Sequence, residues 1–433
     1  SHEIQQIAVW DYEDLKEMVD FDAIKEFRAR ALNPEHPVLR GTAQNPDIFF
    51  QAREASNPFY NALPAVVEEY MAKVNEKIGT NYGLFNYYGA EDATDVIVAM
   101  GSVNQAIEET VDYLVSQGKK VGVLEVHLYR PFSEKYFFAA MPSTVKRVAV
   151  IDRTIEQGAL GEPLYLDVKS VYYGKENAPL IIGGRYGLAS KDTTPDMINA
   201  IYQNLAGEAK NPFTVGINDD IKHTSLEVTE HIDVADPTTT ELLFFGLGSD
   251  GTVGACKNTS KIIGDNTDLY SQSYAAYDSK KSGGSTRLHL RFGKNPIRST
   301  YLVNNPHFVS CSTDAYLAKF NMIDGLRQGG TFLLNTVCPV EEIETLLPNR
   351  YKRILAERNA KFYIINANKL AVEIGLKGKT NTIMQSAFFK LNQHILPYEK
   401  AKELMKAYAA KTFAKKGQAI IECNYNAIDA GGD

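Results

Sequence analysis

Residues 242–263, LLFFGLGSDGTVGACKNTSKII, decide the fold of the C-terminal half of this chain. They begin with a short apolar run that is typical of a buried strand. Three glycines follow, and then a segment whose apolar residues have helical spacing. The pattern Gly246-x-Gly248-x-x-Gly251 matches the dinucleotide fingerprint between a strand and a helix. It predicts a phosphate-binding turn, and a tight turn that binds no ligand is the alternative.

Glycine has two uses in such a turn. It adopts positive φ without steric cost, and it lets a phosphate come close to the backbone. The first amides of the following helix then face the anion.

A second notable stretch, residues 277–291, reads YDSKKSGGSTRLHLR. It follows the strand after the fingerprint helix, where a dinucleotide fold faces the ribose. Asp278 is placed to accept from a ribose hydroxyl. The cations and amides of residues 280–284 suit a phosphate on the ribose. Arg287, His289 and Arg291 alternate and share one strand face; a solvated strand face with lysines in a loop is the alternative.

Residues 92–205 alternate strand and helix four times. Strands are predicted at 94–100, 120–128, 146–151 and 179–183. Helices are predicted at 104–117, from 133 onward, at 162–173 and at 194–205. This alternation favours a parallel sheet covered on both faces and joined by right-handed connections.

A linker-like, polar segment spans residues 206–236, and a second α/β domain follows it. Its strands are predicted at 241–245, 268–274, 286–292, 307–310, 330–335, 361–365 and 418–422. Its helices are predicted at 253–263, 313–321, 340–347, 352–359, 369–375, 382–391 and 398–411. Residues 3–88 are predicted to be helical and irregular, without a core of their own. They either wrap another domain or form the tail of a larger one.

Composition excludes several classes of protein. The chain has 433 residues and a net charge of −7, which argues against a general nucleic-acid or membrane-surface role. No apolar run approaches the roughly 20 residues that span a bilayer. The four cysteines, Cys256, Cys311, Cys338 and Cys423, are scattered, so neither a disulfide framework nor a metal or iron–sulfur site is predicted. Reduced thiols and a cytoplasmic location are expected.

Two further stretches carry polar residues at predicted strand ends. Asp152 and Arg153, with Glu156 and Gly158, follow the third strand, where open sheets bind ligands. Capping of the next helix or an interface salt bridge is the favoured interpretation of Asp152–Arg153. Residues 183–187, GGRYG, form a turn that either holds a phosphate or packs as a loop.

Six motifs together resemble the pyruvate:ferredoxin oxidoreductase family. They are RGTAQNPDIFFQARE at 40–54, AEDATDVIVAMGS at 90–102, GGRYGLASKDTTPDM at 183–197, FFGLGSDGTVGACKN at 244–258, DSKKSGGSTRLHLRFG at 278–293 and FLLNT at 332–336. The resemblance covers essentially the whole chain in order.

The resemblance implies an internal part of a longer enzyme. It implies two α/β domains with mainly parallel sheets: a transketolase C-terminal-like domain at 89–225, and a Rossmann-like domain of the 2-oxoacid oxidoreductase gamma type at 226–433 that uses coenzyme A. Residues 1–88 would be the tail of the preceding pyrimidine-binding domain. The family oxidatively decarboxylates pyruvate on thiamine diphosphate with magnesium, and passes electrons through [4Fe–4S] clusters to ferredoxin or flavodoxin.

These cofactors are expected only in the full-length protein. The nearest match to the family's GDG thiamine motif, Gly264-Asp265-Asn266, departs at the third position and is interpreted as a turn. No metal site and no catalytic residue are predicted on this chain, which is expected to be inactive alone. The other domains of the polypeptide and a homodimer partner are the expected protein partners.

The glycine motif and the family resemblance together predict one coenzyme A site. Its turn carries the amides for the diphosphate, with polar contacts one to two turns into the helix: Gly246, Gly248, Ser249, Asp250, Gly251, Thr252, Lys257 and Asn258. Its basic segment carries contacts for the ribose phosphate: Lys280, Lys281, Ser282, Gly283, Gly284, Arg287 and Arg291. Cys256 either has a lowered thiol pKa near the helix start or packs in the core, and packing is favoured. An NADP-dependent dehydrogenase and a non-catalytic assembly module are the two alternatives.

Overall fold

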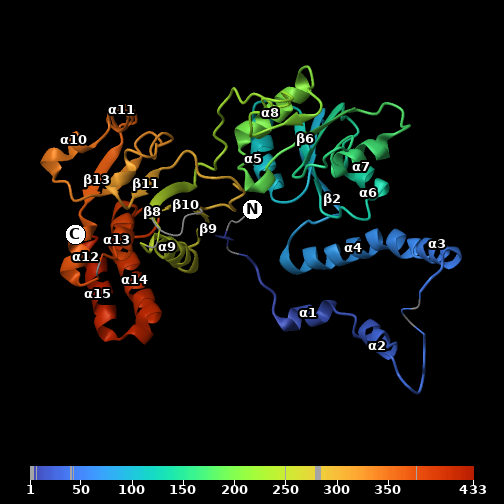
Figure 1. Ribbon diagram of the computed structural model, residues 1–433, viewed down its shortest axis with the longest axis horizontal. Helices are drawn as coiled ribbons and strands as arrows, with labels where there is room; N and C mark the ends of the chain where they lie inside the picture. The colour runs from blue at the N-terminus through green and yellow to red at the C-terminus, as the bar shows by residue number, and fades with distance from the viewer. Residues whose placement is uncertain are drawn as a thin grey trace. The chain divides into compact units, whose positions relative to one another are not determined.

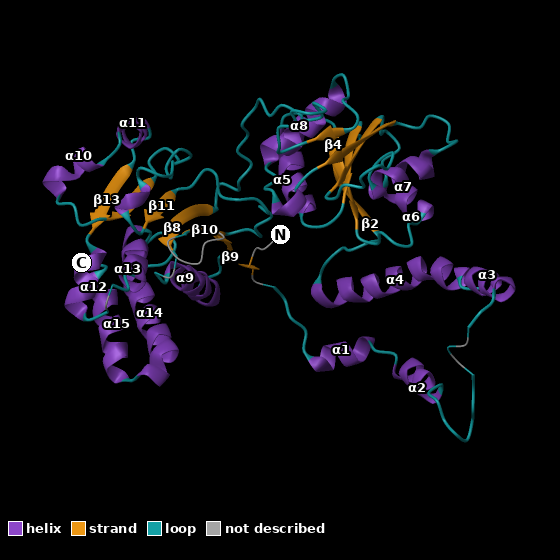
Figure 2. Cartoon of the chain, in the orientation of Figure 1, coloured by secondary structure: helices purple, strands orange, loops and turns teal. Residues whose placement is uncertain are grey.

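The computed structural model describes residues 4–5, 7–39, 41, 43–248, 250–277, 284–376 and 378–433. The chain divides into two compact units. Ile7–Asp233 form the first unit, and Ser1–Gln6 combine with Val234–Asp433 in the second unit. Figure 1 traces the chain through both units, and Figure 2 marks their helices and strands.

The first unit is built on a sheet in the order β2-β4-β3-β5-β6-β7. Its strands are β2 (Phe85–Gly89), β3 (Asp95–Ala99), β4 (Val121–Val126), β5 (Arg147–Asp152), β6 (Leu180–Arg185) and β7 (Phe213–Thr214). All neighbouring strands are parallel except β2, which pairs antiparallel with β4. The four predicted strands are thereby confirmed as β3, β4, β5 and β6. The strands β2 and β7 were not predicted, because β2 buries only Phe85 fully and β7 is two residues long.

Helices cover both faces of this sheet, as the alternation predicts (Figure 1). They are α5 (Val103–Ser116), α6 (Glu134–Ala140), α7 (Pro163–Tyr172) and α8 (Pro195–Ala206). The central strands β3, β4 and β5 carry almost continuous buried apolar runs, as expected for strands that are covered on both faces of the sheet. Phe137 of α6 and Leu164 of α7 pack with Val96, Val98 and Val150 in one of the cores.

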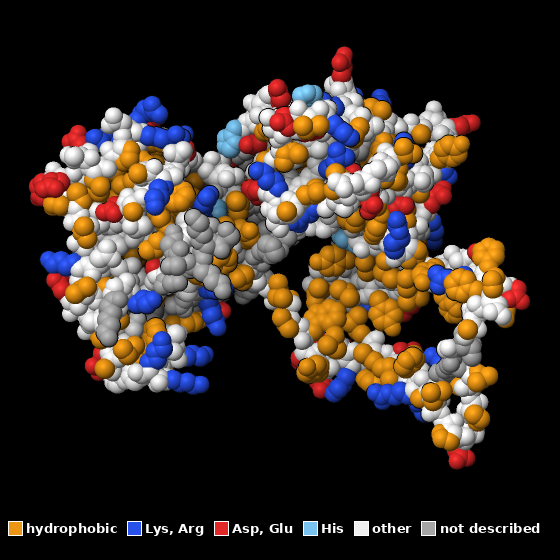
Figure 3. Space-filling view, viewed as in Figure 1, with side chains coloured by type: hydrophobic (Ala, Val, Ile, Leu, Met, Phe, Trp, Pro, Cys, Tyr) orange, Lys and Arg blue, Asp and Glu red, His pale blue; other side chains and the backbone are white. Residues whose placement is uncertain are grey.

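The first four helices of the first unit have no buried residue. They are α1 (Tyr12–Met18), α2 (Phe21–Ala29), α3 (Pro46–Glu54) and α4 (Asn57–Ile78). Large hydrophobic side chains along them are exposed, including Phe50 at 71% and Phe59 at 79%. Figure 3 shows hydrophobic side chains gathered over α1 and α4. Soluble monomers rarely expose such large apolar patches, so this surface is typical of one that packs against further protein.

The second unit is built on a sheet in the order β1-β9-β10-β8-β11-β12-β13. Its strands are β1 (Ile4–Gln5), β8 (Thr240–Leu247), β9 (Tyr270–Tyr277), β10 (Ser285–Gly293), β11 (Phe308–Cys311), β12 (Thr331–Asn335) and β13 (Lys361–Ile365). The strands β8, β11, β12 and β13 run parallel. The strand β10 lies between β8 and β9 and is antiparallel to both. The sheet is therefore mainly parallel, with β10 and β1 reversed.

Two cores flank this sheet. The larger core packs Leu242, Phe244, Leu288 and Leu290 against the helices on one face. Those helices are α9 (Thr252–Asn266), α12 (Ala367–Ile374), α13 (Asn381–Leu391), α14 (Tyr398–Phe413) and α15 (Gln418–Ala430). The opposite face carries α10 (Ile343–Leu346) and α11 (Asn349–Glu357), with Ile354 of α11 in the second core.

Two expectations about the second unit were wrong, and one of its strands was not predicted. Residues 418–422 belong to the helix α15, because Ile421, Asn424 and Ile428 recur at helical spacing toward the core. Residues 313–321 contain only the short 3-10 turn Asp314–Tyr316. The strand β1 pairs with β9 and so adds residues near the N-terminus to this sheet. A strand of two residues has no sequence pattern from which its pairing could be predicted. Among the helices of the described residues, none combines the length and apolarity that a membrane crossing needs.

Candidate functional site

The fingerprint turn lies at the carboxyl end of β8 and leads directly into α9. Gly246 is needed there because a Cβ would lie 2.7 Å from the Cβ of Thr252. Gly251, the residue before α9, has φ +95°, a conformation that L side chains rarely adopt. The predicted strand–turn–helix geometry is therefore confirmed.

The turn is closed by the carboxylate of Asp250. One carboxylate oxygen accepts the Leu247 N–H at 2.8 Å and the other accepts the Thr252 N–H at 2.7 Å. The Asp250 N–H donates to the Leu247 carbonyl at 3.0 Å, and the Gly248 N–H donates to the Gly284 carbonyl at 2.9 Å. All three amides are engaged within the protein, and their predicted contact with a diphosphate stays a prediction.

A second helix begins beside this turn. The side chain of Asn381, the first residue of α13, lies 2.7–3.0 Å from the position a Cβ on Gly251 would take. Thr252, Ser310, Ser312 and Asn381 contribute to the lining of a cavity of about 20 Å³ between the two helices and the sheet. Asn381 was not predicted as a site residue, because it lies far from Gly251 in the sequence and no local pattern connects the two.

The strand β10 begins at the same end of the sheet, opposite the last residue of β8. In the β8–β10 register, Ser285 pairs with Leu247 and Arg287 pairs with Phe245. Arg287 is exposed, and its guanidinium lies 5.6 Å from the centre of the Phe320 ring. The predicted site residues Ser249, Lys280, Lys281, Ser282 and Gly283, together with Asp278, fall outside the residues that the structure describes.

The fingerprint helix carries the remaining predicted residues. Lys257 is exposed and Asn258 is partly exposed, both in the second turn of α9. Their contact with a ligand stays a prediction. Cys256 is buried, and burial raises the pKa of its thiol, which supports the packing interpretation.

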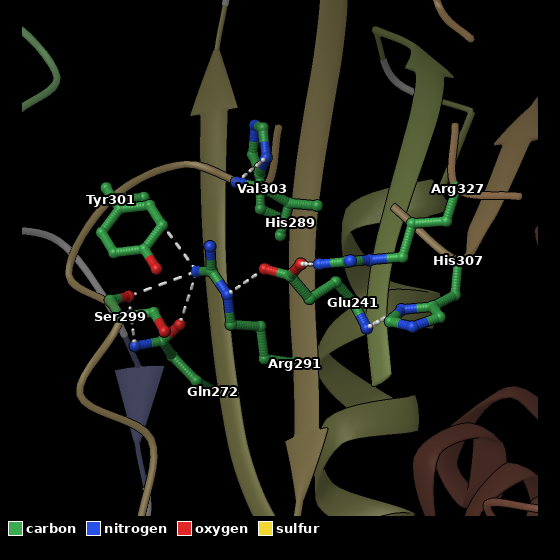
Figure 4. Close-up of polar contacts among 9 residues, drawn as sticks. All are labelled: Glu241, Gln272, His289, Arg291, Ser299, Tyr301, Val303, His307 and Arg327. Atoms are coloured by element: carbon green, nitrogen blue, oxygen red, sulfur yellow. Dashed lines mark hydrogen bonds and ion pairs between the residues drawn. The ribbon is translucent and has the colours of Figure 1, made fainter. Parts of the chain in front are cut away.

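Arg291 does not belong to this edge, and its predicted role in phosphate binding was wrong. It pairs with Glu241 at the opposite end of β8 and is 2% exposed. Its Nε donates to the Glu241 carboxylate at 2.8 Å, and Nη1 donates to the carbonyls of Ser299 and Tyr301 (Figure 4). The other carboxylate oxygen of Glu241 accepts from Arg327 at 2.9 Å. Arg291 is therefore a buried structural cation.

His289 lies on the same strand face and is buried as well. Its Nδ1 accepts the Val303 N–H at 3.1 Å, which places the proton of the neutral ring on Nε2 (Figure 4). Burial, together with the positive charges of Arg291 and Arg287, lowers the pKa of His289 to about 3. The ring is therefore neutral at physiological pH.

The polar residues of the first unit serve the fold. Asp152 is 1% exposed, and its carboxylate accepts the N–H groups of Leu164 and Tyr165 at the start of α7. Burial raises the pKa of this carboxyl group. The Arg153 guanidinium donates a hydrogen bond to the Gly187 carbonyl at 2.8 Å, and Arg185 forms a salt bridge with Glu162 at 3.0 Å. The favoured helix-capping interpretation of Asp152 is confirmed.

The structure offers no metal-binding cluster among its described residues, since no three His, Cys, Asp or Glu side chains gather suitably. Gly264-Asp265-Asn266 lie in the last turn of α9, where the Asp265 carboxylate accepts from the Tyr408 hydroxyl at 2.9 Å. These residues do not fit a thiamine diphosphate or magnesium site, and the four cysteines are free thiols.

Three family models match the chain in order. Pyruvate flavodoxin/ferredoxin oxidoreductase, thiamine diphosphate-binding, matches residues 1–72. Pyruvate:ferredoxin oxidoreductase core domain II matches residues 93–198, and pyruvate ferredoxin/flavodoxin oxidoreductase matches residues 241–433.

Curated relatives match over the full chain. The pyruvate-flavodoxin oxidoreductase of Enterobacter agglomerans is 55% identical over 433 residues, which is 100% of this chain and 37% of that protein. The pyruvate:ferredoxin oxidoreductase of Moorella thermoacetica is 53% identical over 430 residues, which is 99% of this chain and 37% of that protein. The chain thus spans somewhat more than a third of the length of these relatives.

Proposed function

Because the chain belongs to the pyruvate ferredoxin/flavodoxin oxidoreductase family, we propose that it forms part of an enzyme that oxidatively decarboxylates pyruvate to acetyl-coenzyme A. The observation that carries the proposal is identity of 53–55% over essentially the whole chain, with three family models in order. The enzyme would use thiamine diphosphate with magnesium and [4Fe–4S] clusters, and would pass electrons to ferredoxin or flavodoxin.

Thiamine diphosphate supplies the carbanion chemistry of such an enzyme, and the described residues of this chain do not fit it. The match to the thiamine-binding family model coincides with α1–α4, whose apolar side chains are exposed. We propose that these helices pack against the remainder of that domain, as the tail that residues 1–88 were predicted to form. The helices would then help to assemble the cofactor site without contributing a catalytic group.

The second unit is proposed to bind coenzyme A through its nucleotide end. The supporting arrangement is the closed turn before α9 and the β9–β10 connection, which meet through the Gly248–Gly284 hydrogen bond. Arg287 is an exposed cation three residues after Gly284, and Lys280 and Lys281 lie in the connection by sequence. Guanidinium and ammonium groups bind phosphomonoesters by charge-assisted hydrogen bonds. The ribose 3′-phosphate is therefore the expected main contact.

Calorimetric titration of the chain with coenzyme A tests this role. Weak but saturable binding is expected, since the proposed contacts involve only the nucleotide end of the ligand. A parallel titration with NADP⁺ separates the dehydrogenase alternative, and binding of neither ligand would favour a pure assembly module. With pyruvate, thiamine diphosphate, magnesium, coenzyme A and a viologen dye, the chain alone is expected to reduce no dye.

Two properties of the complete enzyme stay proposals. A homodimer is proposed because transketolase-like domains usually bury one face against a twofold partner. Sedimentation that finds only monomer at high protein concentration would contradict it. A cytoplasmic location is proposed from free thiols and the expected electron carriers.

A further inference from the structure

The strand β2 lies at one edge of the sheet in the first unit. It is the first strand in the order β2-β4-β3-β5-β6-β7, and among the strands that the structure describes only β4 pairs with it. The helices α5 and α6 both pack against it (Figure 2). A strand in this position presents a row of backbone N–H and C=O groups to which a further chain segment can pair.

The register with β4 identifies the backbone groups of β2 that face this outer edge. The His127 N–H donates to the Leu84 carbonyl at 3.0 Å, and the Ala90 N–H donates to the Val121 carbonyl at 3.0 Å. Because hydrogen-bonded positions alternate along an antiparallel pair, the even-numbered residues of β2 face β4. The backbone groups that face the outer edge are therefore those of Phe85, Tyr87 and Gly89.

Two grooves border β2 and give room for an extended segment. The larger groove, about 660 Å³, lies between β2, the second half of α5 and the residues at the end of α6. The smaller groove, about 230 Å³, lies between α4, the start of β2 and α6. Ala139 and Ala140 line both grooves, so the two are neighbours. The volume of the larger groove is in the range of protein sites that enclose a compact organic ligand.

Among the described residues that line the two grooves, every charged one is an acid. These acids are Glu68 on α4, Glu91 after β2 and Asp112 on α5. The Tyr136 hydroxyl donates to Glu68 and the Tyr88 hydroxyl donates to Asp112, each at 2.6 Å. Complementary charge favours a basic partner segment. A twofold contact would place the same acids of two copies near one another, which disfavours a second copy of this chain as the partner.

From the outer edge, the grooves and their charge we propose that β2 pairs with an added strand, supplied by the same polypeptide from outside residues 1–433. The added strand carries apolar and basic side chains. Backbone hydrogen bonds along Tyr87 and Gly89 hold it, as in other cases of strand addition, and its lysine or arginine side chains lie against the groove carboxylates. This chain spans 37% of the length of its two relatives, so a longer polypeptide has ample chain to supply the strand. The inference is independent of the proposed coenzyme A site.

The test compares hydrogen exchange along β2 in this chain and in the complete polypeptide that contains it, by mass spectrometry at residue resolution. The amides of Tyr87 and Gly89 should exchange at least roughly tenfold more slowly in the complete polypeptide, because each gains a hydrogen-bond partner. The Tyr88 amide faces β4 and should be protected in both, which makes it the internal reference. Equal exchange of the Tyr87 and Gly89 amides in the two proteins would overturn the proposal.

Glu91→Lys in the complete polypeptide tests the charge of the added strand. Glu91 is exposed, and a lysine there repels a basic segment, so protection of the Tyr87 amide should fall at least about threefold. Glu176→Lys is the matched control, because Glu176 is an exposed acid of the same unit that lines neither groove. Its exchange should equal that of the wild type. Unchanged protection in Glu91→Lys would overturn the basic chemistry proposed for the segment.

Sedimentation of this chain alone distinguishes a second copy as the occupant. Exchange of the Tyr87 amide should not depend on the concentration of this chain. If the Tyr87 amide instead becomes protected as a dimer forms at rising concentration, the edge of β2 binds a second copy and the proposal is wrong.

Discussion

The two ends of β10 carry arginines on one strand face, yet the two arginines have different environments. Arg287, at the end beside the glycine turn, is exposed and contacts the Phe320 ring. Arg291, four residues on, is buried against Glu241, Gln272 and two backbone carbonyls. Alternation in a sequence fixes the face of a strand, but it does not say which end of the sheet is open to ligands. We propose that the open end of β10 binds the ligand, whereas the buried residues at its closed end stabilise the fold.

Removal of the buried arginine should have the largest effect. Arg291→Ala leaves the Glu241 carboxylate with one cation and leaves the Ser299 and Tyr301 carbonyls without this donor. Breaking a buried pair typically costs about 3–5 kcal/mol. We expect the urea midpoint of the second unit to fall, with faster hydrogen exchange in β10, while the folded fraction still binds coenzyme A.

Arg353→Ala is the control for that experiment. Arg353 and Glu357 lie 3.9 Å apart with both side chains more than 60% exposed, and such pairs contribute little. If Arg291→Ala unfolds no more easily than this control, the structural role of the closed end is wrong.

Blocking the turn at the open end should have the next largest effect. Gly251→Val places a branched side chain at φ +95° and within 2.7 Å of Asn381. Affinity for coenzyme A and for dephospho-coenzyme A should fall equally, by about a hundredfold or roughly 2.7 kcal/mol. Gly254→Ala is the control, because a Cβ at Gly254 meets no atom within 4 Å. Normal binding by Gly251→Val would show that the turn is not part of the site.

A substitution in the β9–β10 connection should affect coenzyme A and dephospho-coenzyme A differently. Lys281→Ala is expected to weaken coenzyme A by ten- to a hundredfold, since a charge-assisted contact contributes about 1.5–3 kcal/mol. Dephospho-coenzyme A, which lacks the 3′-phosphate, should be nearly unaffected in the same titration. Lys369→Ala, an exposed lysine of α12, is the control. Equal loss for both ligands would remove the phosphate role of Lys281.

The buried histidine between the two arginines should make the second unit sensitive to acid. The folded pKa of His289 is about 3, below the unfolded value of about 6.5. The unfolded chain therefore binds more protons between these values, and stability falls as pH falls through this window. At pH 5.5 the loss should be about 1.4 kcal/mol relative to neutral pH, from one pH unit in the window.

His289→Gln tests that linkage with urea denaturation at several pH values. Its amide oxygen can accept the Val303 N–H and does not titrate. The variant should show a flatter loss of stability between pH 6.5 and 5.5 than the wild type. Identical slopes would mean that His289 is not the titrating group.

Local signals predicted much of the architecture. The apolar runs of β3, β4, β5 and β8 and the glycines before α9 are contiguous in sequence, so both parallel sheets and the turn were predictable. The insertion of β10 between β8 and β9 was not, because strand order depends on pairing between distant segments. The same holds for β1, which adds two residues near the N-terminus to the far edge of the second sheet.

The site was predictable only in part, for physical reasons. The glycine pattern gives the turn, but it does not show that Asp250 folds back on the amides. Asn381 reaches Gly251 through packing of α13 on α9, which no spacing rule contains. Arg287 and Arg291 belong to the same alternating sequence pattern. Only the pairing register, which places Arg287 opposite Phe245 and Arg291 opposite Glu241, shows that they lie toward different ends of the sheet.

The most direct test of the account compares the two arginines by calorimetry with coenzyme A. Arg287→Ala should fold with wild-type stability and bind coenzyme A about fivefold more weakly, as expected for one exposed cation contact of about 1 kcal/mol. Arg291→Lys should unfold at lower urea and bind coenzyme A with wild-type affinity in its folded state. Wild-type binding by Arg287→Ala together with lost binding by folded Arg291→Lys would contradict the division of roles along β10.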